Sequence, residues 1–331
     1  MFFLWRCITW LMSPAARVMR RWFYRPLARL AGSRGGPLAG RPASASRGAA
    51  LLGAGAATAA IAWGLEVRRR EAHCRCDSRP ASVHVWFVRH GETENNLLLR
   101  QMGEGQEYEK ARSSDPPLSA LGRDQVRRVA RHPALAKLFV PGKPPVDIYS
   151  SPLLRAIETA APLQGALPGS PPIRIRPELA EIGGLRQVLE DGGLELLPGA
   201  SPAELRARFP GLELDVSEVP SEGWWSGGAI EDKTEPGRRA IRSRVARVAR
   251  WVREVRPTAP EGRHVVVIGH GALLNRLLVE LLGIPHGSCT FSHGNTAVTH
   301  LELRGNTVHV HCMNWVASGR QPSDPMSASV T

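Results

Sequence analysis

Short apolar segments alternate with amphipathic ones between residues 83 and 312. Runs of mostly apolar residues predict strands, and apolar residues at steps of three and four predict helices. The expected strands are Val83–Val88, Val146–Ser150, Ile173–Arg176, His264–Ile268, Ala297–Leu303 and Thr307–Cys312. The expected helices are 118 to about 132, Pro152–Leu163, Glu235–Val255 and Ala272–Leu282. This alternation predicts a three-layer α/β/α protein with a mostly parallel central sheet flanked by helices.

The helix expected over Glu235–Val255 has a clear amphipathic pattern. Its apolar stripe consists of Ile241, Val245, Val248, Val252 and Val255, at steps of three and four. The arginines between them are expected to form a solvated face. The stretch from 194 to 233 shows no such period, and we expect it to be long and irregular.

The first 48 residues have the composition of a targeting leader. They contain nine arginines, no lysine and no acidic residue. Basic segments that also contain Ser, Ala and Gly are typical of organelle transit peptides. We therefore expect a basic targeting leader over 1–48 and a mitochondrial location. A plastid is one alternative, because its transit peptides have a similar composition. A secretory-pathway membrane is the other, because 2–12 is largely apolar.

An uncharged segment follows the leader. Residues 49–65 are 17 uncharged positions flanked by Arg47 and by the basic residues 68–70. A membrane-spanning helix needs roughly 17–25 residues, so this segment is a candidate for a single membrane helix and for membrane association. The alternative is a flexible or cleaved part of the leader. We expect a linker over 66–82 and a disordered tail over 317–331.

The charge and the cysteines argue against three classes of protein. The net charge is +13, but most of it belongs to the leader, so we expect no nucleic-acid partner. The five cysteines are few and scattered, which argues against a disulfide framework. Their spacing also does not fit a structural zinc site.

Two predicted strands lead into a histidine followed by a glycine. The first runs through Arg89 into His90-Gly91, and the second runs into His270-Gly271. In open α/β sheets the binding crevice lies at the carboxyl ends of the strands. Two imidazoles and a guanidinium at one edge predict a site for phosphoryl transfer.

Five segments, in chain order, resemble the signature of the histidine phosphatase superfamily, which is also called phosphoglycerate-mutase-like. They are Arg89–Asn96, Asp115–Gln125, Tyr149–Ala160, Leu179–Gly183 and Gly269–Gly271. The resemblance implies a catalytic domain over 83–316. It also implies that His90 is the nucleophile, that Arg89, Arg155 and His270 hold the phosphoryl group, and that no metal or cofactor takes part.

The resemblance assigns three further residues. Glu181 is the proton donor and then the base for water, and Glu178 is its local competitor. Asn96 contacts phosphate or orients the loop, although a one-residue slip would put Asn95 in this role. Gly271 belongs with the phosphate-binding residues.

The chemistry of these residue types fits the implied roles. An imidazole with an unperturbed pKa of about 6.5 is a competent nucleophile near pH 7. Arg89 and Arg155 offer planar forks that match phosphoryl oxygens two at a time. Such groups stabilise the charge that spreads over the transferring phosphoryl group.

The predicted function is that of a metal-independent phosphatase that hydrolyses phosphomonoesters through a phosphohistidine at His90. The substrate is a phosphorylated small molecule or a phosphoprotein. The aromatic-Gly-Trp segment typical of glycolytic mutases is absent, and 102–105 stands near its place. Two alternatives stay open: a phosphoglycerate or sugar-phosphate mutase, and a membrane-tethered, non-catalytic adaptor. The adaptor is motivated by 49–65 and by the altered residues 184–187.

Two other groups of residues have weaker patterns. Trp224 and Trp225 lie in the irregular stretch, and they either line the substrate pocket or pack into the core. His309 and His311 alternate along the last strand, which places them on one face. We expect that face to be solvated and not to be a metal site.

Overall fold

The computed structural model of the protein describes residues 81–129, 131, 135, 138, 146–167, 169–189, 193–225, 230–259 and 262–316. The expected leader, membrane segment, most of the linker and the tail lie outside the described residues, so these expectations stay predictions. Within the ranges given, no helix has both the length and the apolar character needed to cross a bilayer.

A seven-stranded sheet forms the centre of the described part of the chain, with the order β6-β3-β2-β7-β1-β8-β9. Its strands are β1 (Val83–Arg89), β2 (Val146–Ser150), β3 (Ile173–Ile175), β6 (Leu214–Asp215), β7 (Arg263–Gly269), β8 (Val298–Arg304) and β9 (Thr307–Trp315). The strands from β6 to β1 are parallel, and β8 and β9 continue the sheet through antiparallel pairs. The predicted mostly parallel sheet is confirmed.

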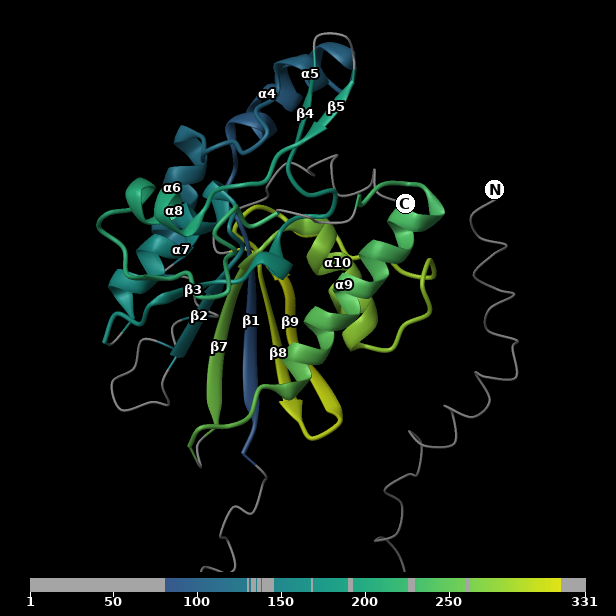
Figure 1. The fold of residues 1–331 in the computed structure, drawn as a ribbon. Coiled ribbons are helices and arrows are strands. Elements are labelled where there is room, and N and C mark those ends of the chain that lie inside the picture. Colours follow the sequence, from purple (N-terminus) through teal and green to yellow (C-terminus); the bar gives the residue numbers. More distant parts are fainter. Residues whose placement is uncertain are drawn as a thin grey trace, which may run out of the picture. The chain divides into compact units, whose positions relative to one another are not determined.

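Helices cover both faces of this sheet (Figure 1). The helices are α4 (Glu94–Met102), α5 (Gln106–Ala111), α6 (Ala120–Val129), α7 (Leu154–Ala166), α8 (Pro202–Arg208), α9 (Glu235–Glu254) and α10 (Gly271–Leu281), with the 3-10 turn η2 (Pro177–Leu179). A two-stranded sheet is formed by β4 (Arg186–Val188) and β5 (Leu194–Leu196).

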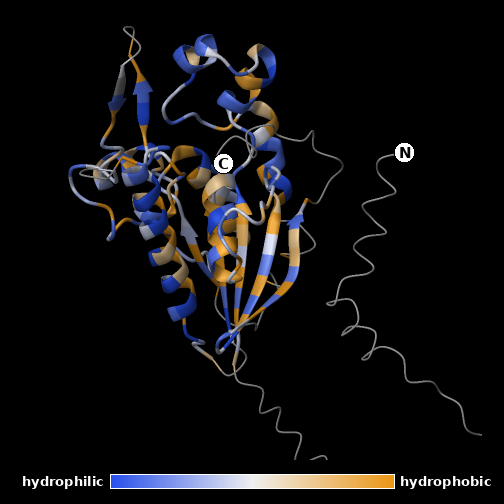
Figure 2. Cartoon of the chain, turned by 90° about the vertical axis from the view of Figure 1, so that its right-hand side faces the viewer, coloured by the Kyte–Doolittle hydropathy of each residue, from blue (hydrophilic) through white to orange (hydrophobic). Residues whose placement is uncertain are grey.

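The apolar run of β1 arises because this strand is buried on both faces. Trp86 and Val88 pack in one core with α6, α7 and α8, while Val85 and Phe87 pack in a second core with α9 and α10. Apolar residues gather on the sheet and on the helix surfaces that face it (Figure 2). Strands of this kind carry continuous apolar residues, so two cores, one on each face, give the expected three layers.

Two parts of the chain are more regular than the sequence pattern predicts. The stretch expected to be irregular contains β5, α8 and β6. Residues 94–111 form α4 and α5, for which no helix was predicted. The start of α4 is nevertheless encoded locally: Thr93 and Asn96 form a reciprocal capping box that satisfies its first backbone N–H groups.

The order of the central strands determines where the site lies. β7 lies between β1 and β2, with Arg89 paired to Gly269 and Ser150 paired to Ile268. The residues that follow these three parallel strands therefore emerge side by side at one edge. The α4–α5 and β4–β5 segments rise above that edge (Figures 1 and 2).

Candidate active site

The two predicted histidines meet at the carboxyl edge of the sheet. The ring centroids of His90 and His270 are 5.1 Å apart. The strand register continues into this edge, because the His90 backbone N–H donates to Gly269 and the Ser151 N–H donates to Ile268, each at 3.0 Å. The structure thus brings together the two imidazoles that the sequence places 180 residues apart.

A backbone contact fixes the tautomer of His90. Its Nδ1 lies 2.7 Å from the carbonyl oxygen of Gly91. A carbonyl can only accept, so Nδ1 carries the proton and Nε2 keeps its lone pair. Burial lowers the pKa of His90 well below 6.5, and the nearby positive charges of Arg155 and Arg89 lower it further. His90 is therefore neutral near pH 7, as a nucleophile must be.

His270 is oriented by a serine from the neighbouring strand. Its Nε2 lies 2.7 Å from the Ser151 hydroxyl, and the same hydroxyl accepts from the Leu153 N–H at 3.3 Å. If the serine proton points to Nε2, His270 carries its own proton on Nδ1, which is buried without a protein partner. Burial, followed by the charge of Arg155, lowers the pKa of His270 well below 6.5.

The two predicted arginines are held close to His90. Arg89 is 5% exposed and donates to the backbone carbonyl of His293. A Cβ on Gly271 would lie 3.4 Å from the Nε of Arg89, so this glycine is in close contact with the guanidinium. The Nη1 atom of Arg155 lies 3.7 Å from Oδ1 of Asp115. Burial lowers the pKa of Arg155, whereas the charges of Asp115 and Glu181 raise it.

A network of buried polar contacts fixes the loop after His90. The Gly91 N–H donates to the Thr159 hydroxyl at 3.0 Å, and the Ser119 hydroxyl donates to the Glu92 carboxylate at 2.7 Å. A Cβ on Gly122 would come within 1.9 Å of the Glu92 carbonyl oxygen, so only glycine fits at this approach. Glu92, although part of the His90 motif, acts in this loop as a structural residue.

Glu181 lies against the first turn of α10, directly after His270. Its carboxylate accepts from the backbone N–H groups of Ala272 at 3.2 Å and Leu273 at 3.0 Å, and from Ile182 at 2.8 Å. The competitor Glu178 instead pairs with Arg247 at 2.7 Å and Arg176 at 3.2 Å. The geometry favours Glu181 as the carboxylate of this site.

Comparison with known proteins identifies the family of this chain. The model of the histidine phosphatase superfamily (branch 1) matches residues 85–188 and 199–316. The chain belongs to the histidine phosphatase superfamily. Its curated relatives are named phosphatases, and the chain is accordingly an enzyme of the phosphoric monoester hydrolase class.

Individual relatives show how far the similarity extends. The chain is 30% identical over 224 residues to a glucosyl-3-phosphoglycerate phosphatase of Mycolicibacterium vanbaalenii, covering 67% of this chain and 84% of that one. It is 35% identical over 103 residues to a mannitol-1-phosphatase of Eimeria tenella, or 30% of each chain. Among solved structures, mycobacterial hydrolase 1 is 24% identical, with a TM-score of 0.43, and the alignment covers 71% of this chain and all of that one.

The two asparagines of the histidine phosphatase motif have different contacts. The Asn96 carboxamide oxygen accepts from the Thr93 N–H and hydroxyl, each at 3.0 Å. The buried Asn95 instead bonds the backbone of Ser113 through both ends of its carboxamide. Of the two roles expected for Asn96, these contacts fit loop orientation.

The interpretation of the α9 arginines as a solvated face is wrong for Arg244. This side chain is 4% exposed and forms a bidentate pair with the buried Glu231, at 2.6 and 2.7 Å. It also donates to the backbone carbonyls of Glu178 and Ala180 at 2.8 and 2.7 Å. Arg244 thereby supports the backbone that presents Glu181.

The two tryptophans also take part in this support. Trp224 is 3% exposed and belongs to the core, while Trp225 is partly buried against it. A Cβ on Gly184 would collide with the Trp225 indole at 2.3 Å, and the Arg244 guanidinium lies 5.7 Å from the Trp225 ring centre. Of the two alternatives for these residues, the structure favours core packing.

Two more residues near His90 escaped the sequence interpretation. Asn295 donates from its buried carboxamide to the His90 carbonyl at 3.1 Å. His293 is 2% exposed, and neither of its ring nitrogens has a protein partner. Burial and the charge of Arg89 lower the pKa of His293 to about 4. Both residues lie in a loop whose contact with β1 is tertiary, so local pattern carries no signal for them.

We expect Arg244→Met to destabilise the fold by about 3–5 kcal/mol, because it leaves Glu231 buried without a counter-charge. Removing both charges in Arg244→Met/Glu231→Leu should recover part of this loss. The exposed Arg250 on the same helix provides the control variant Arg250→Met, for which a change within about 0.5 kcal/mol is expected. Urea unfolding measures all four proteins. Equal stabilities of the Arg244 and Arg250 variants would contradict the assignment.

His293 should make the fold less stable in acid. Between about pH 6.5 and 4 the unfolded chain binds a proton at this residue that the folded chain does not, so stability falls as the pH falls. Between pH 7 and 5, the free energy of unfolding of His293→Leu should therefore fall by about 2 kcal/mol less than that of the wild type. Urea unfolding at each pH measures this, with the exposed His309→Leu as control. Parallel curves for wild type and His293→Leu would refute the argument.

Proposed function

We propose that this enzyme is a metal-independent phosphomonoesterase that works through a phosphohistidine on Nε2 of His90. The observation that carries the proposal is the contact of Nδ1 with the Gly91 carbonyl, which leaves the Nε2 lone pair available. The charges of the buried Arg89 and the partly buried Arg155 lie close enough to lower the pKa of this imidazole. A phosphoryl dianion in the same place would be attracted to both.

In the first step, Nε2 of His90 attacks phosphorus as the bond from phosphorus to the ester oxygen breaks. The departing alkoxide takes a proton from the protonated Glu181 and leaves as an alcohol. Arg89, Arg155 and the Nδ1–H of His270 bind the equatorial oxygens, where charge spreads in the transition state. Gly271 leaves room for Arg89 beside the start of α10.

In the second step, water attacks the phosphohistidine and gives its proton to the Glu181 carboxylate. The phosphorus–nitrogen bond breaks, inorganic phosphate leaves, and Nε2 regains its lone pair. The neighbouring cations oppose a further proton on His90, so the imidazole is returned in its nucleophilic form. Three backbone N–H groups keep the carboxyl group of Glu181 in place for both steps.

For the substrate, we propose a phosphate ester of a small polyhydroxylated metabolite. Two relatives support this class through their names, which specify glucosyl-3-phosphoglycerate and mannitol 1-phosphate. Neither name specifies a phosphoprotein, which is the other substrate class that the sequence leaves open.

The first experiment follows label from a ³²P-phosphate ester into the protein. Wild type quenched in alkali should retain a labelled histidine that acid releases, and His90→Ala should retain none. We expect His90→Ala to lower the hydrolysis of an aryl phosphate by at least about 10³-fold, because no covalent intermediate forms. The exposed His286 supplies the control variant His286→Ala, which should keep the full rate. Hydrolysis by His90→Ala at the wild-type rate would refute the proposal.

The second experiment separates the two glutamates. An aryl phosphate has a good leaving group, so Glu181→Gln should still form the phosphohistidine but hydrolyse it about 10²–10⁴-fold more slowly. Rapid quenching should show labelled enzyme accumulating in Glu181→Gln. Glu178→Gln is the matched control, because its carboxylate pairs with arginines outside the site, and its labelled fraction should equal that of wild type. Accumulation in Glu178→Gln alone would reverse the assignment.

A further inference from the structure

Three histidines gather on the sheet beside the first half of β1, away from His90, which follows its last residue. His84 is the second residue of β1, whereas His90 follows the last one. His300 comes from β8 and His311 from β9, and we call these three residues the histidine cluster. The proposed phosphatase chemistry makes no use of them.

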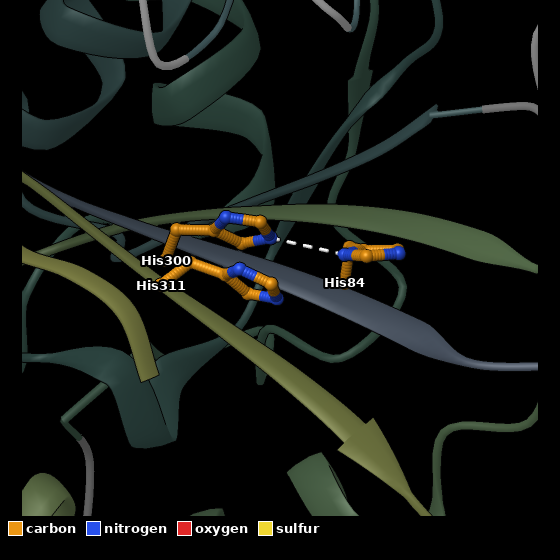
Figure 3. Close-up of side chains that lie close together, drawn as sticks. All are labelled: His84, His300 and His311. Atoms are coloured by element: carbon orange, nitrogen blue, oxygen red, sulfur yellow. Dashed lines mark hydrogen bonds between the residues drawn. The ribbon is translucent and has the colours of Figure 1, made fainter. Parts of the chain in front are cut away.

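The ring nitrogens of the histidine cluster converge. One nitrogen from each residue can be chosen so that all three lie within 4.8 Å of one another. Nδ1 of His84 and Nε2 of His300 are 3.0 Å apart, and the His300 and His311 rings are stacked with centroids at 4.5 Å. Figure 3 shows His300 and His311 extending from one side and His84 from the other, with nitrogens toward a common point.

An irregularity in β9 brings His311 to this point. His300 pairs with Cys312 and Leu301 pairs with Val310, so His311 is one extra residue between two consecutive pairs. Such a β-bulge bends the strand and changes the direction of a side chain. His309, two residues earlier, is paired with Glu302 and is exposed. The bulge thus gives His311 a position that simple alternation would not predict.

A buried carboxylate adjoins the histidine cluster. Glu302 is 3% exposed, and its Oε2 lies 2.8 Å from Nε2 of His311. Its Oε1 is 3.9 Å from Nε2 of His84 and accepts from Arg304 at 2.6 Å. Carboxylates next to metal-binding imidazoles orient the rings or act as a further ligand, and they add the negative charge that a cation needs.

Packing alone explains the stacking but not the convergence of the nitrogens. The His300 ring stacks on the Trp86 ring with centroids 3.5 Å apart, so aromatic contact explains why the two ring planes are nearly parallel. Stacking on Trp86 requires only the face of a ring. Here, in addition, the nitrogen-bearing edges of three imidazoles from three strands point toward one another beside a carboxylate. Tetrahedral zinc with nitrogen at about 2.0–2.1 Å has ligands about 3.3 Å apart, close to the separation of His84 and His300.

We propose that His84, His300 and His311 bind a divalent transition-metal ion of the zinc class, with Glu302 beside them. Neutral imidazole nitrogens suit zinc, copper, nickel and cobalt, and not magnesium or calcium. On binding, the metal takes the place of the proton between His84 and His300, and that proton moves to the other nitrogen of its own ring, so that each neutral imidazole keeps one N–H. The side chain of His311 is 45% exposed and can rotate to close the remaining distance. The ion would join β1 to the β8–β9 hairpin, far from the phosphoryl site.

The test uses the full chain with Zn²⁺ as the probe. Every protein carries Cys74→Ser and Cys76→Ser, because these thiols beside His73 are themselves zinc ligands by type. Zinc at about 100 times its dissociation constant should raise the Tm by about 5–10 °C. His84→Gln and His311→Gln should lose this rise. His309→Gln is the matched control, since it removes a histidine from the same strand and should keep it.

Cobalt(II) supplies a second readout that does not depend on unfolding. One equivalent should give the intense visible absorption of a tetrahedral site in the control His309→Gln and only weak absorption in His311→Gln. Hydrolysis of an aryl phosphate should be the same for both variants, because His309 and His311 have no contact with the residues of the phosphoryl site. The proposal is overturned if zinc stabilises His311→Gln as much as the control. It is equally overturned if neither zinc nor cobalt gives a signal in the control.

Discussion

The position of β7 between β1 and β2 is the constraint on which the catalytic arrangement depends. Parallel strands end at the same edge, and their hydrogen-bond register sets the order of the residues that emerge there. His90, His270 and Ser151 are therefore neighbours, although they are far apart in the chain. The first contacts beyond the strands are backbone hydrogen bonds that extend this register. Side-chain geometry at the site is thus fixed by main-chain pairing.

Electrostatics then determine what the two imidazoles can do. Burial together with Arg89 and Arg155 opposes protonation of His90 and His270. Gathering cations around neutral rings is unfavourable for a protein that needs only stability, but it suits a dianion that arrives with its own negative charge. The backbone beside Glu181 is held by a separate interaction. The buried Arg244 pairs with Glu231 and donates hydrogen bonds to two backbone carbonyls next to Glu181. One buried ion pair thus helps to place the proposed proton donor without touching it.

The sequence predicted the parts of this structure that are local. Val83–Val88 is apolar because both its faces are buried, and periodicity detects that. The arginines of α9 look alike in sequence, yet Arg244 is buried and paired with Glu231, whereas Arg250 is exposed. The pairing of Arg244 with Glu231 depends on how the helix docks. The buried environment of His293 is likewise not visible in the sequence pattern, because its neighbour Arg89 comes from a strand that is distant in the chain. His311 escapes the alternation rule because the bulge inserts one residue into β9. Tertiary contacts therefore account for what pattern reasoning missed.

The two ends of β1 show that neighbours, and not the residue type, determine the chemistry of histidine. At the carboxyl end, the imidazoles of His90 and His270 are close to two guanidinium groups, which repel a metal cation and attract a phosphate ester. At the other end, the imidazoles of the histidine cluster adjoin the carboxylate of Glu302, whose charge attracts a cation, although Arg304 offsets part of it. A neutral imidazole lone pair is the reactive group in both places. One sheet can therefore present the same side chain to phosphorus at one end and to a metal ion at the other.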